Sequence, residues 1–440
     1  MKRIGVYWFT HDLRVNDNQL LHKAAQELDE LICLYCVPKI TPFLQRFSQR
    51  HKLGSARQQF INQSVHDLLQ SLRRYDQTLL VMDRAPVTVL RYLIEHHQVT
   101  HLYCDQFSGY DEQQVCKQIT REFPTLVLSQ LANNTLFEQG QLPFAITELP
   151  NTFTQFRKLV ETLPIVLPCS RPSFLPPPVN VQLPSVHLPL FAPDQTLYPG
   201  GEAAGIVHCQ HYFATTSASH YKETRNALDD ELASTKFSPW LALGCVSPKT
   251  IVAMLRHYEV QQGQNESTYW IVFELLWREY FYWYARKYQS ALFQFAGIHH
   301  KRPLTSFYAS RFLQWVKGHT PYPIVNACMK QLNETGYMSN RGRQLVASCL
   351  IHELGLDWRY GAAFFETQLL DYDVASNWGN WQYLAGVGAD PRGSRQFNLD
   401  KQTELYDPER RFIKRWHGDD NVTDIYDVDM ADWPILPKDK

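Results

Sequence analysis

This chain of 440 residues carries almost no net charge, because 43 lysines and arginines stand against 44 aspartates and glutamates. That balance excludes nucleic-acid binding through a polycationic tail, although a local basic patch remains compatible with it. The apolar runs are short and interrupted by charge, which excludes a membrane-spanning helix. The N-terminus lacks a signal-peptide cleavage site, and no transit or transmembrane segment is visible, so a cytoplasmic protein is expected.

Two further absences concern cysteine and phosphate-binding loops. The nine cysteines are odd in number and lack framework spacing, which predicts free thiols in a reducing compartment and no disulfide scaffold. Cys33 and Cys36 form a C-x-x-C pair inside an apolar strand segment, which favours core thiols over redox or metal chemistry. No metal site is predicted. The glycine-rich dinucleotide fingerprint and the Walker loop are missing, so neither the usual dinucleotide site nor a P-loop NTPase is expected.

The chain divides into parts with different patterns. The first 130 residues alternate β-rich runs with amphipathic stretches, which predicts a doubly wound, five-stranded parallel sheet. Residues 164–199 contain ten prolines, which exclude helix interiors and central strands there. From Gly201 onward the apolar spacing is helical, and ten of eleven tryptophans lie from Trp240 onward. We predict an α/β domain at 1–130, a proline-rich connector at 131–200 and an all-α domain at 201–440.

The predicted elements have the following limits. Strands are predicted at 3–9, 31–37, 78–82, 101–104 and 125–128, and helices between them at 18–28, 55–75, 87–97 and 112–122. In the second half, helices are predicted at 247–258, 269–286, 323–334, 341–353 and 358–370.

Segment 234–241 combines hydroxyls, a lysine and a helix start. Ser238 suits the N-cap and Pro239 suits the first turn. Free N–H groups at a helix start, next to Lys236, would bind phosphate. A helix cap without a ligand is the alternative.

Segment 273–281 places Glu274, Trp277, Arg278 and Phe281 on one helical face. A carboxylate, an indole and a guanidinium on one face suit the stacking and polar contacts that hold an extruded base. A helix edge with a Glu274–Arg278 ion pair is the alternative.

Two later segments complete a polar and aromatic set. Segment 336–344 opens a helix with two close arginines, and segment 370–383 alternates acidic and amide groups with aromatics in a predicted loop. Because buried charge needs partners, the segments together predict a pocket for a polar, aromatic-rich ligand such as a flavin with its adenine.

These segments and residues 8–18, in their order along residues 1–416, resemble the signatures of the photolyase/cryptochrome family. The resemblance implies an α/β antenna domain and a helical domain that binds FAD in a bent form. It also implies light-driven electron transfer from reduced flavin to a flipped-out cyclobutane pyrimidine dimer. Gln344 and Tyr383 stand where dimer photolyases carry methionine and tryptophan, and with segments 221–226 and 237–241 they resemble the DASH cryptochrome branch.

The resemblance also implies roles for single residues. It implies catalysis by Glu274 and Trp277 against the dimer, Asn377 near flavin N5, and Trp381 and Trp358 as electron relay, with Thr305 in place of the third relay tryptophan and Trp315 or Tyr308 as substitutes. It implies FAD binding by Tyr221, Ser234, Thr235, Lys236, Phe237, Ser238, Glu274, Arg278, Asn340, Arg343, Asp371, Asp373 and Asn377, with an Arg343–Asp371 ion pair. It implies DNA contacts by Trp277, Asn340, Arg341, Gln344 and Tyr383, to which a basic rim of Arg392, Arg395 and Lys401 is added.

A second chromophore is implied for the antenna domain. Glu112 stands at the position that resembles the family's pterin-binding glutamate, so methenyltetrahydrofolate is expected there. The alternative is a first-turn carboxylate that the helix dipole favours.

The substitutions at Gln344 and Tyr383 reduce stacking on a flipped dimer, and stacking contributes about 1–3 kcal/mol per base. Flipping costs a few kcal/mol from a duplex and less from a single strand. We therefore expect a DASH-type cryptochrome, a deoxyribodipyrimidine photo-lyase that prefers single-stranded DNA. Weaker binding of duplex DNA or RNA, a monomer and no membrane partner are expected. The alternatives are a general duplex photolyase and a blue-light photoreceptor without repair.

Overall fold

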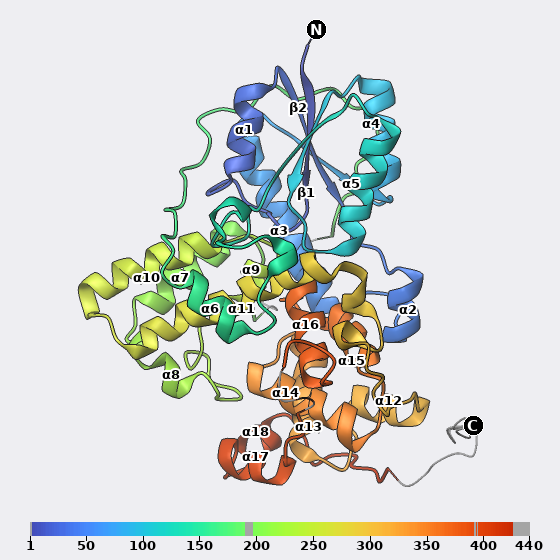
Figure 1. Ribbon diagram of the computed structural model, residues 1–440, viewed down its shortest axis with the longest axis vertical. Coiled ribbons are helices and arrows are strands. Elements are labelled where there is room, and N and C mark those ends of the chain that lie inside the picture. The colour runs from blue at the N-terminus through green and yellow to red at the C-terminus, as the bar shows by residue number, and fades with distance from the viewer. Residues whose placement is uncertain (1, 190–196, 391–392, 394, 426–440) are drawn as a thin grey trace.

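The structure is a computed structural model that describes residues 2–189, 197–390, 393 and 395–425. Its N-terminal part is one five-stranded parallel sheet in the order β3-β2-β1-β4-β5. This confirms the predicted doubly wound α/β fold, which occupies the upper half of Figure 1. The strands are β1 (Ile4–Phe9), β2 (Glu30–Cys36), β3 (Leu79–Met82), β4 (His101–Asp105) and β5 (Val127–Leu131).

Alternation along the central strand sends side chains into two cores. On β1, Tyr7 and Phe9 join the larger core, whereas Val6 and Trp8 join a smaller one on the other face. Helices α1 (Gln19–Glu27) and α3 (Ser55–Arg73) cover the first face, and α4 (Pro86–His97) and α5 (Tyr110–Glu122) cover the second.

The proline-rich stretch runs along the sheet without a helix among its described residues, 164–189 and 197–199. Pro178 forms a parallel bridge with Leu31, and Gln77 donates to the carbonyl of Pro176 at 2.6 Å. Before this stretch, α6 (Phe153–Val160) packs against α11 (Glu266–Tyr288), the longest helix in the part of the chain that the structure describes. Residues 131–200 are therefore in contact with both halves of the chain.

The lower half of Figure 1 is helical, as predicted, and α11 lies in its upper part, beneath the sheet. Asn265 caps α11 by accepting from the Thr268 amide at 2.9 Å. The helices are α7 (Glu202–Phe213), α8 (Tyr221–Thr224), α9 (Ser238–Ala242), α10 (Pro248–Gln262), α11 (Glu266–Tyr288), α12 (Ala309–Lys317), α13 (Pro323–Thr335), α14 (Asn340–Ser348), α15 (Trp358–Gln368), α16 (Val374–Leu384), α17 (Leu399–Tyr406) and α18 (Arg411–Arg415).

One local prediction was wrong, and several helices, such as α6, α12, α17 and α18, had no predicted range. Segment 370–383 is not a loop, because α16 begins at Val374 with Asp373 accepting from the Ser376 amide at 2.8 Å. Most of this helix is buried on several sides, so its residues lack the one-sided apolar period by which helices are recognised. The short helix α2 (Pro42–Ser48) was not predicted, although Thr41 caps it and Pro42 opens it.

Arg14 joins the two halves at the carboxyl end of the sheet. Its guanidinium donates to the Gly244 carbonyl at 2.8 Å, to the Asn133 carbonyl at 2.6 Å and to Asn134 Oδ1 at 2.7 Å. Gly244 has φ +62, and a Cβ there would lie 1.8 Å from the His11 carbonyl oxygen. Only glycine allows so close an approach of the two backbones.

Glu279 of α11 holds the same junction from the other side. Its carboxylate accepts from the Leu136 amide at 2.8 Å and from Trp283 Nε1 at 2.8 Å. Burial raises the pKa of Glu279 to about 7, against the lowering effect of these hydrogen bonds. The folded state therefore prefers the protonated carboxyl, whereas the unfolded state ionises near its ordinary pKa.

This gives a prediction for stability against pH. Between about pH 4.5 and pH 7 the ionisation of Glu279 favours the unfolded chain, so stability should fall as pH rises, by about 3 kcal/mol. Glu279→Gln should remove this fall in the free energy of unfolding with rising pH, whereas Glu95→Gln on the surface should leave it unchanged. Urea unfolding at several pH values measures it, and equal slopes for wild type and Glu279→Gln would contradict it.

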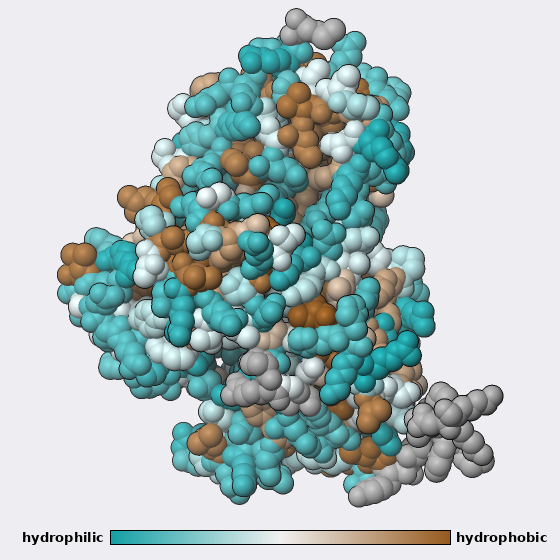
Figure 2. Space-filling model, in the orientation of Figure 1, coloured by the Kyte–Doolittle hydropathy of each residue, from teal (hydrophilic) through white to brown (hydrophobic). Residues whose placement is uncertain are grey.

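The surface in Figure 2 is mostly hydrophilic, with apolar residues in small groups. Across the part of the chain that the structure describes, no helix is both long and apolar enough to cross a membrane. All nine cysteines are free, and both members of the C-x-x-C pair are buried in the sheet, where burial raises the pKa of the Cys36 thiol to about 12. Such thiols pack as core residues.

Candidate functional site

A cavity of about 470 Å³ lies in the helical half. That volume is within the range of small-molecule and cofactor sites. The cavity gathers residues that are far apart in the sequence, from α8, the segment before α9, α11, α14 and α16. The predicted residues among its lining are Tyr221, Ser234, Thr235, Lys236, Phe237, Ser238, Glu274, Trp277, Arg278, Asn340, Arg343, Gln344, Asp371, Asp373, Tyr383 and Arg395.

The segment before α9 forms a wall that is suited to an anion. Lys236 is only 6% exposed and adopts a left-handed backbone with φ 52. Its ammonium lies 5.1 Å from the ring centroid of Tyr337, and none of the carboxylates that the structure describes lies within ion-pair distance of it. A lysine that lines a cavity without a carboxylate partner among the described residues leaves its charge available to an anionic ligand.

Ser238 differs from its predicted role. It is the first residue of α9, and Phe237 stands at the N-cap position without a side-chain cap hydrogen bond. The prediction of Ser238 as the capping residue was therefore wrong by one position. Because the Ser238 hydroxyl does not cap the helix, it contributes to the cavity lining beside Ser234 and Thr235.

Two ion pairs form the opposite wall. Arg343 Nη2 lies 2.7 Å and 3.0 Å from the two carboxylate oxygens of Asp371, whose side chain is 2% exposed, so the expected pair is present. Burial would lower the pKa of Arg343, but the charge and hydrogen bonds of Asp371 together raise it. Arg278 lies 3.6 Å from Asp373. These pairs keep charged donors and acceptors fixed at the cavity wall.

Glu274 has a different partner from the one that helical spacing suggested. Arg225 Nη1 donates to Glu274 Oε1 at 2.8 Å, so the alternative of a Glu274–Arg278 pair was wrong. Burial raises the pKa of the Glu274 carboxyl, and the charge of Arg225 only partly offsets this. The carboxyl is thus a stronger base than a surface glutamate and faces the cavity.

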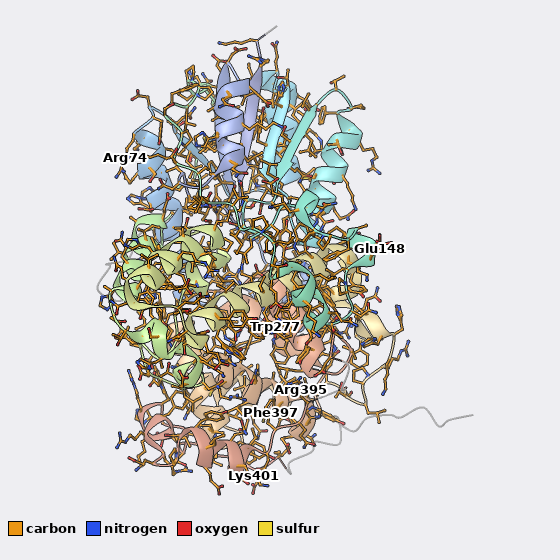
Figure 3. The ribbon with its side chains drawn as sticks, turned by 60° about the vertical axis from the view of Figure 1, so that its left-hand side comes forward. Arg74, Glu148, Trp277, Arg395, Phe397 and Lys401 are labelled. Carbon is orange, nitrogen blue, oxygen red and sulfur yellow. The ribbon has the colours of Figure 1, made fainter. Side chains whose placement is uncertain are left out.

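The aromatic wall of the cavity is built around Trp277. Phe153 of α6 stacks on its indole, with ring centroids 3.8 Å apart and planes 13° apart. Tyr383 meets the same indole edge-on, with centroids 6.0 Å apart. The Arg395 guanidinium lies 4.6 Å from the Tyr383 ring centroid and pairs with Asp390. Figure 3 shows Trp277, Arg395 and Lys401 following one another down this side of the molecule.

Several predicted residues lie away from the cavity lining. Asn377 is not among the lining residues, and its amide donates to the Ala362 carbonyl at 3.0 Å. Arg341 lies 4.6 Å from the Tyr406 ring centroid and donates to Asn226. Lys401 is exposed on α17. Glu112 lies on the first turn of α5, and Arg392 lies outside the described residues.

The predicted relay tryptophans are buried behind the lining. Trp381 is 2% exposed and meets Trp315 edge-on, with ring centroids 6.3 Å apart. Trp358 is 1% exposed and contacts Trp378 at 5.8 Å. Trp315 thus adjoins Trp381, whereas Tyr308 lies under Arg311.

Sequence reasoning missed Arg225 and Tyr337 as lining residues. Arg225 lies four residues after Tyr221, so one helical turn places both on the same face, and this spacing was the available signal. Tyr337 stands between a predicted glycine turn and a helix start, where no pattern indicated that Lys236 would lie over its ring.

Comparison with known proteins adds two family matches. Residues 5–173 match the family described as DNA photolyase, and residues 270–420 match the FAD binding domain of DNA photolyase. The chain is 60% identical to cryptochrome DASH of Vibrio parahaemolyticus, over 99% of this chain and 98% of that protein.

Two solved structures are similar over most of the chain. A cryptochrome from Synechocystis sp. PCC6803 has a TM-score of 0.85 and 38% identity, covering 94% of this chain and 89% of the other. A class III photolyase from Agrobacterium tumefaciens has a TM-score of 0.78 and 26% identity, covering 94% and 86%.

Proposed function

This chain belongs to the cryptochrome DASH branch of the photolyase/cryptochrome family, and from that membership we propose that it repairs cyclobutane pyrimidine dimers in single-stranded DNA under blue light. The observation that carries the proposal is that Glu274 and Trp277 of α11 line the same cavity as Lys236, Arg278 and Arg343. That combination provides a stacking surface, a proton-holding group and a cofactor site in one cavity.

FAD fits the residues of this cavity. Lys236 lacks a carboxylate among the described residues, so it would hold the FAD phosphates together with the hydroxyls of Ser234, Thr235 and Ser238. The Nε atom of Arg225 is buried without a hydrogen-bond partner in the described part of the chain, which leaves a donor for a ligand.

The ion pairs would orient the flavin and the adenine. Asp371 and Asp373 offer carboxylate acceptors that Arg343 and Arg278 fix in place. When bound, FAD supplies the chemistry that the side chains lack, which is light-driven donation of an electron to the dimer and its recovery after the ring splits.

The dimer would lie against Trp277. Because Phe153 covers one indole face, the ring is held in one orientation, and the dimer would stack on the remaining surface between Trp277 and Tyr383. Arg225 engages Glu274 Oε1, so Oε2 is the atom that would share a proton with a base carbonyl. The raised pKa of Glu274 supports this role.

Illumination of the reduced holoprotein with dimer-containing oligonucleotides tests the proposal, with recovered thymine as the measurement. Repair of single-stranded but not duplex substrate supports it. Equal repair of both would indicate a general duplex photolyase. No repair of either, with the flavin fully bound, would indicate a photoreceptor without repair.

Single-strand preference should depend on the mouth of the cavity. Tyr383→Trp with Gln344→Met adds apolar stacking surface, and we expect duplex repair to rise by about fivefold or more, since 1 kcal/mol corresponds to about that factor. Rates on both substrates measure it. Tyr406→Trp is the matched control, because Tyr406 also lies 4.6 Å beneath an arginine but outside the cavity lining. An unchanged ratio of duplex to single-strand rates in the double variant would contradict it.

The proposed division into domains is 1–130 for the antenna, 131–200 for the connector and 201–440 for FAD binding. The last strand ends at Leu131, which supports the first boundary. The 270–420 match to the FAD binding domain lies within the third part.

Methenyltetrahydrofolate is proposed as the antenna chromophore at Glu112. The charge of Glu112 contributes, after burial, to raising the pKa of Tyr372 and Glu366, which places it at the border with α15 and α16. Glu112→Gln should remove near-ultraviolet absorption of a non-flavin chromophore while the flavin band remains. Retention of that absorption would contradict this assignment.

A further inference from the structure

A basic surface lies on α2 and the turn that follows it. Between Glu30 and Asp67 the sequence has no acidic residue. Arg46, Arg50 and Lys52 are exposed, and none of them pairs with a carboxylate that the structure describes. Their positive field is therefore not neutralised by neighbours, which attracts a polyanion.

The arginines of this surface are held against aromatic rings. Arg46 lies 5.6 Å from the Phe47 centroid, and Arg50 of the α2–α3 turn lies 5.3 Å from the Phe364 centroid on α15. From the other helix, the guanidinium of Arg359 on α15 lies 4.4 Å from the ring centroid of Phe47 on α2. These contacts restrict the guanidinium groups before any ligand arrives, which lowers the entropy cost of binding.

Asp357 restrains Arg359 further, at 2.7 Å. We call Arg46, Arg50, His51, Lys52 and Arg359 the α2 basic face. Each arginine side chain carries five N–H donors in a planar guanidinium group. These donors suit phosphate oxygens, and the flat group suits stacking on a base.

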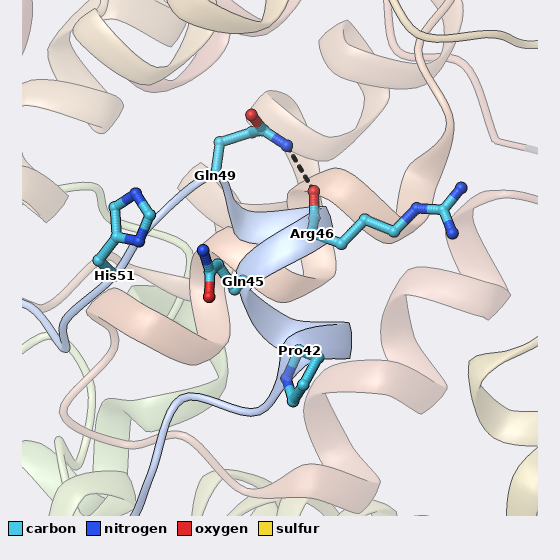
Figure 4. A pocket seen from close by; sticks show the side chains of 5 residues that line it. All are labelled: Pro42, Gln45, Arg46, Gln49 and His51. Carbon is cyan, nitrogen blue, oxygen red and sulfur yellow. Dashed lines mark hydrogen bonds between the residues drawn. The ribbon is translucent and has the colours of Figure 1, made fainter.

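The α2 basic face is also hollowed. A depression of about 380 Å³ is lined by Pro42, Gln45, Arg46, Gln49 and His51. Figure 4 shows Arg46 and His51 reaching out on opposite sides of this helix end, with the two glutamine amides between them. Phe43, which follows the lining residue Pro42 in the sequence, is 39% exposed. Cations, amides and an exposed ring together provide contacts for phosphates, base edges and base faces.

This face is separate from the FAD-type cavity. The two sets of lining residues share no member. In Figure 1, α2 lies at the right-hand side beside α15, whereas α8 and α14, which contribute to the cavity, lie to its left. A short single-stranded oligonucleotide that fills the cavity therefore leaves α2 uncovered.

We propose that the α2 basic face is a second binding surface for single-stranded nucleic acid, which it holds by backbone phosphates and unpaired bases irrespective of damage. The single-stranded form is favoured because duplex bases are stacked away from the guanidinium planes and from Phe43. The inference goes beyond the repair function and does not rest on it.

The test compares two charge reversals of equal size in the full holoprotein. R46E/R50E changes the face, and R73E/R74E changes two exposed arginines at the end of α3, where Figure 3 labels Arg74. The probe is fluorescent oligothymidylate of about 30 nucleotides, longer than the roughly 4–16 that one single-strand site covers. Fluorescence anisotropy in the dark gives Kd over a range of salt concentrations.

For R46E/R50E we expect Kd to rise about tenfold or more, and the slope of log K against log salt to fall by about 1.4, since each phosphate contact contributes about 0.7. R73E/R74E should change Kd by less than about twofold. Equal Kd values for the two variants would overturn the proposal. Displacement of the probe from wild type by polyglutamate of equal charge would also overturn it, in favour of an acidic protein partner.

Two readouts protect the conclusion. Melting temperature and bound flavin confirm folding, and R46Q/R50Q, measured in the same way, replaces the reversal if that variant fails to fold. Repair of an oligonucleotide of about six nucleotides with one dimer should be equal in all variants, because that length is near the lower end of the roughly 4–16 nucleotides that one site covers and is enough to occupy the cavity alone. If the wild type does not repair this oligonucleotide, the proposed function is contradicted, whereas the anisotropy result remains valid.

Discussion

The Asp371→Ala variant is expected to lose bound flavin and about 3–5 kcal/mol of stability. Removal of this carboxylate, whose side chain is only 2% exposed, leaves the charge of the partly buried Arg343 without its partner. An unpaired buried charge is costly, whereas the pair itself contributes little net free energy. Urea unfolding and the flavin content per purified chain measure the two effects.

The matched control is Glu122→Ala, which breaks the surface pair with Arg91 at 2.9 Å. Surface pairs contribute about 0–1 kcal/mol, so this variant should keep its flavin and nearly all of its stability. If Asp371→Ala behaved like Glu122→Ala in both measurements, the role assigned to the buried pair would be wrong.

Trp277→Ala is expected to weaken binding of a dimer-containing single strand by about 1–3 kcal/mol, or about 5- to 150-fold in Kd. The indole is the main stacking surface at the cavity mouth, and Phe153 holds it in place from behind. Titration in the dark separates this loss of binding from any change in photochemistry.

Trp277→Phe should recover part of the affinity, because a smaller ring keeps a stacking face. Trp416→Ala removes an indole that donates to Asp229 and is not among the cavity lining residues, and it should leave affinity unchanged. Equal losses in Trp277→Ala and Trp416→Ala would show that the effect reflects general destabilisation and not stacking.

Sequence patterns located helices best where residues at the ends mark the limits. Helix α13 begins at the predicted Pro323, because a proline start and a glycine end mark it. The helix α16 was missed because polar residues, including the buried Asn377 and Gln382, interrupt its apolar period, and no proline marks its start as one does in α13. A buried helix can contain polar groups when neighbours satisfy them, and sequence spacing does not reveal those neighbours.

For the site, sequence could name residue types but not partners. The Arg343–Asp371 pair followed from a family resemblance, and the structure contains it. Glu274 pairs with Arg225, which lies outside the reach of any helical spacing, so only the packing of α8 against α11 brings them together. Long-range pairs of this kind depend on tertiary structure and are invisible to periodicity.

The contact between Gly244 and His11 has a consequence for light capture. Since the backbones touch there and Arg14 bonds to both sides, the α/β part cannot slide or rotate against the helical half without breaking buried hydrogen bonds. Two pigments held in the two halves would keep one separation and one mutual orientation of their transition dipoles. Non-radiative energy transfer would then have the same efficiency in every molecule of the population.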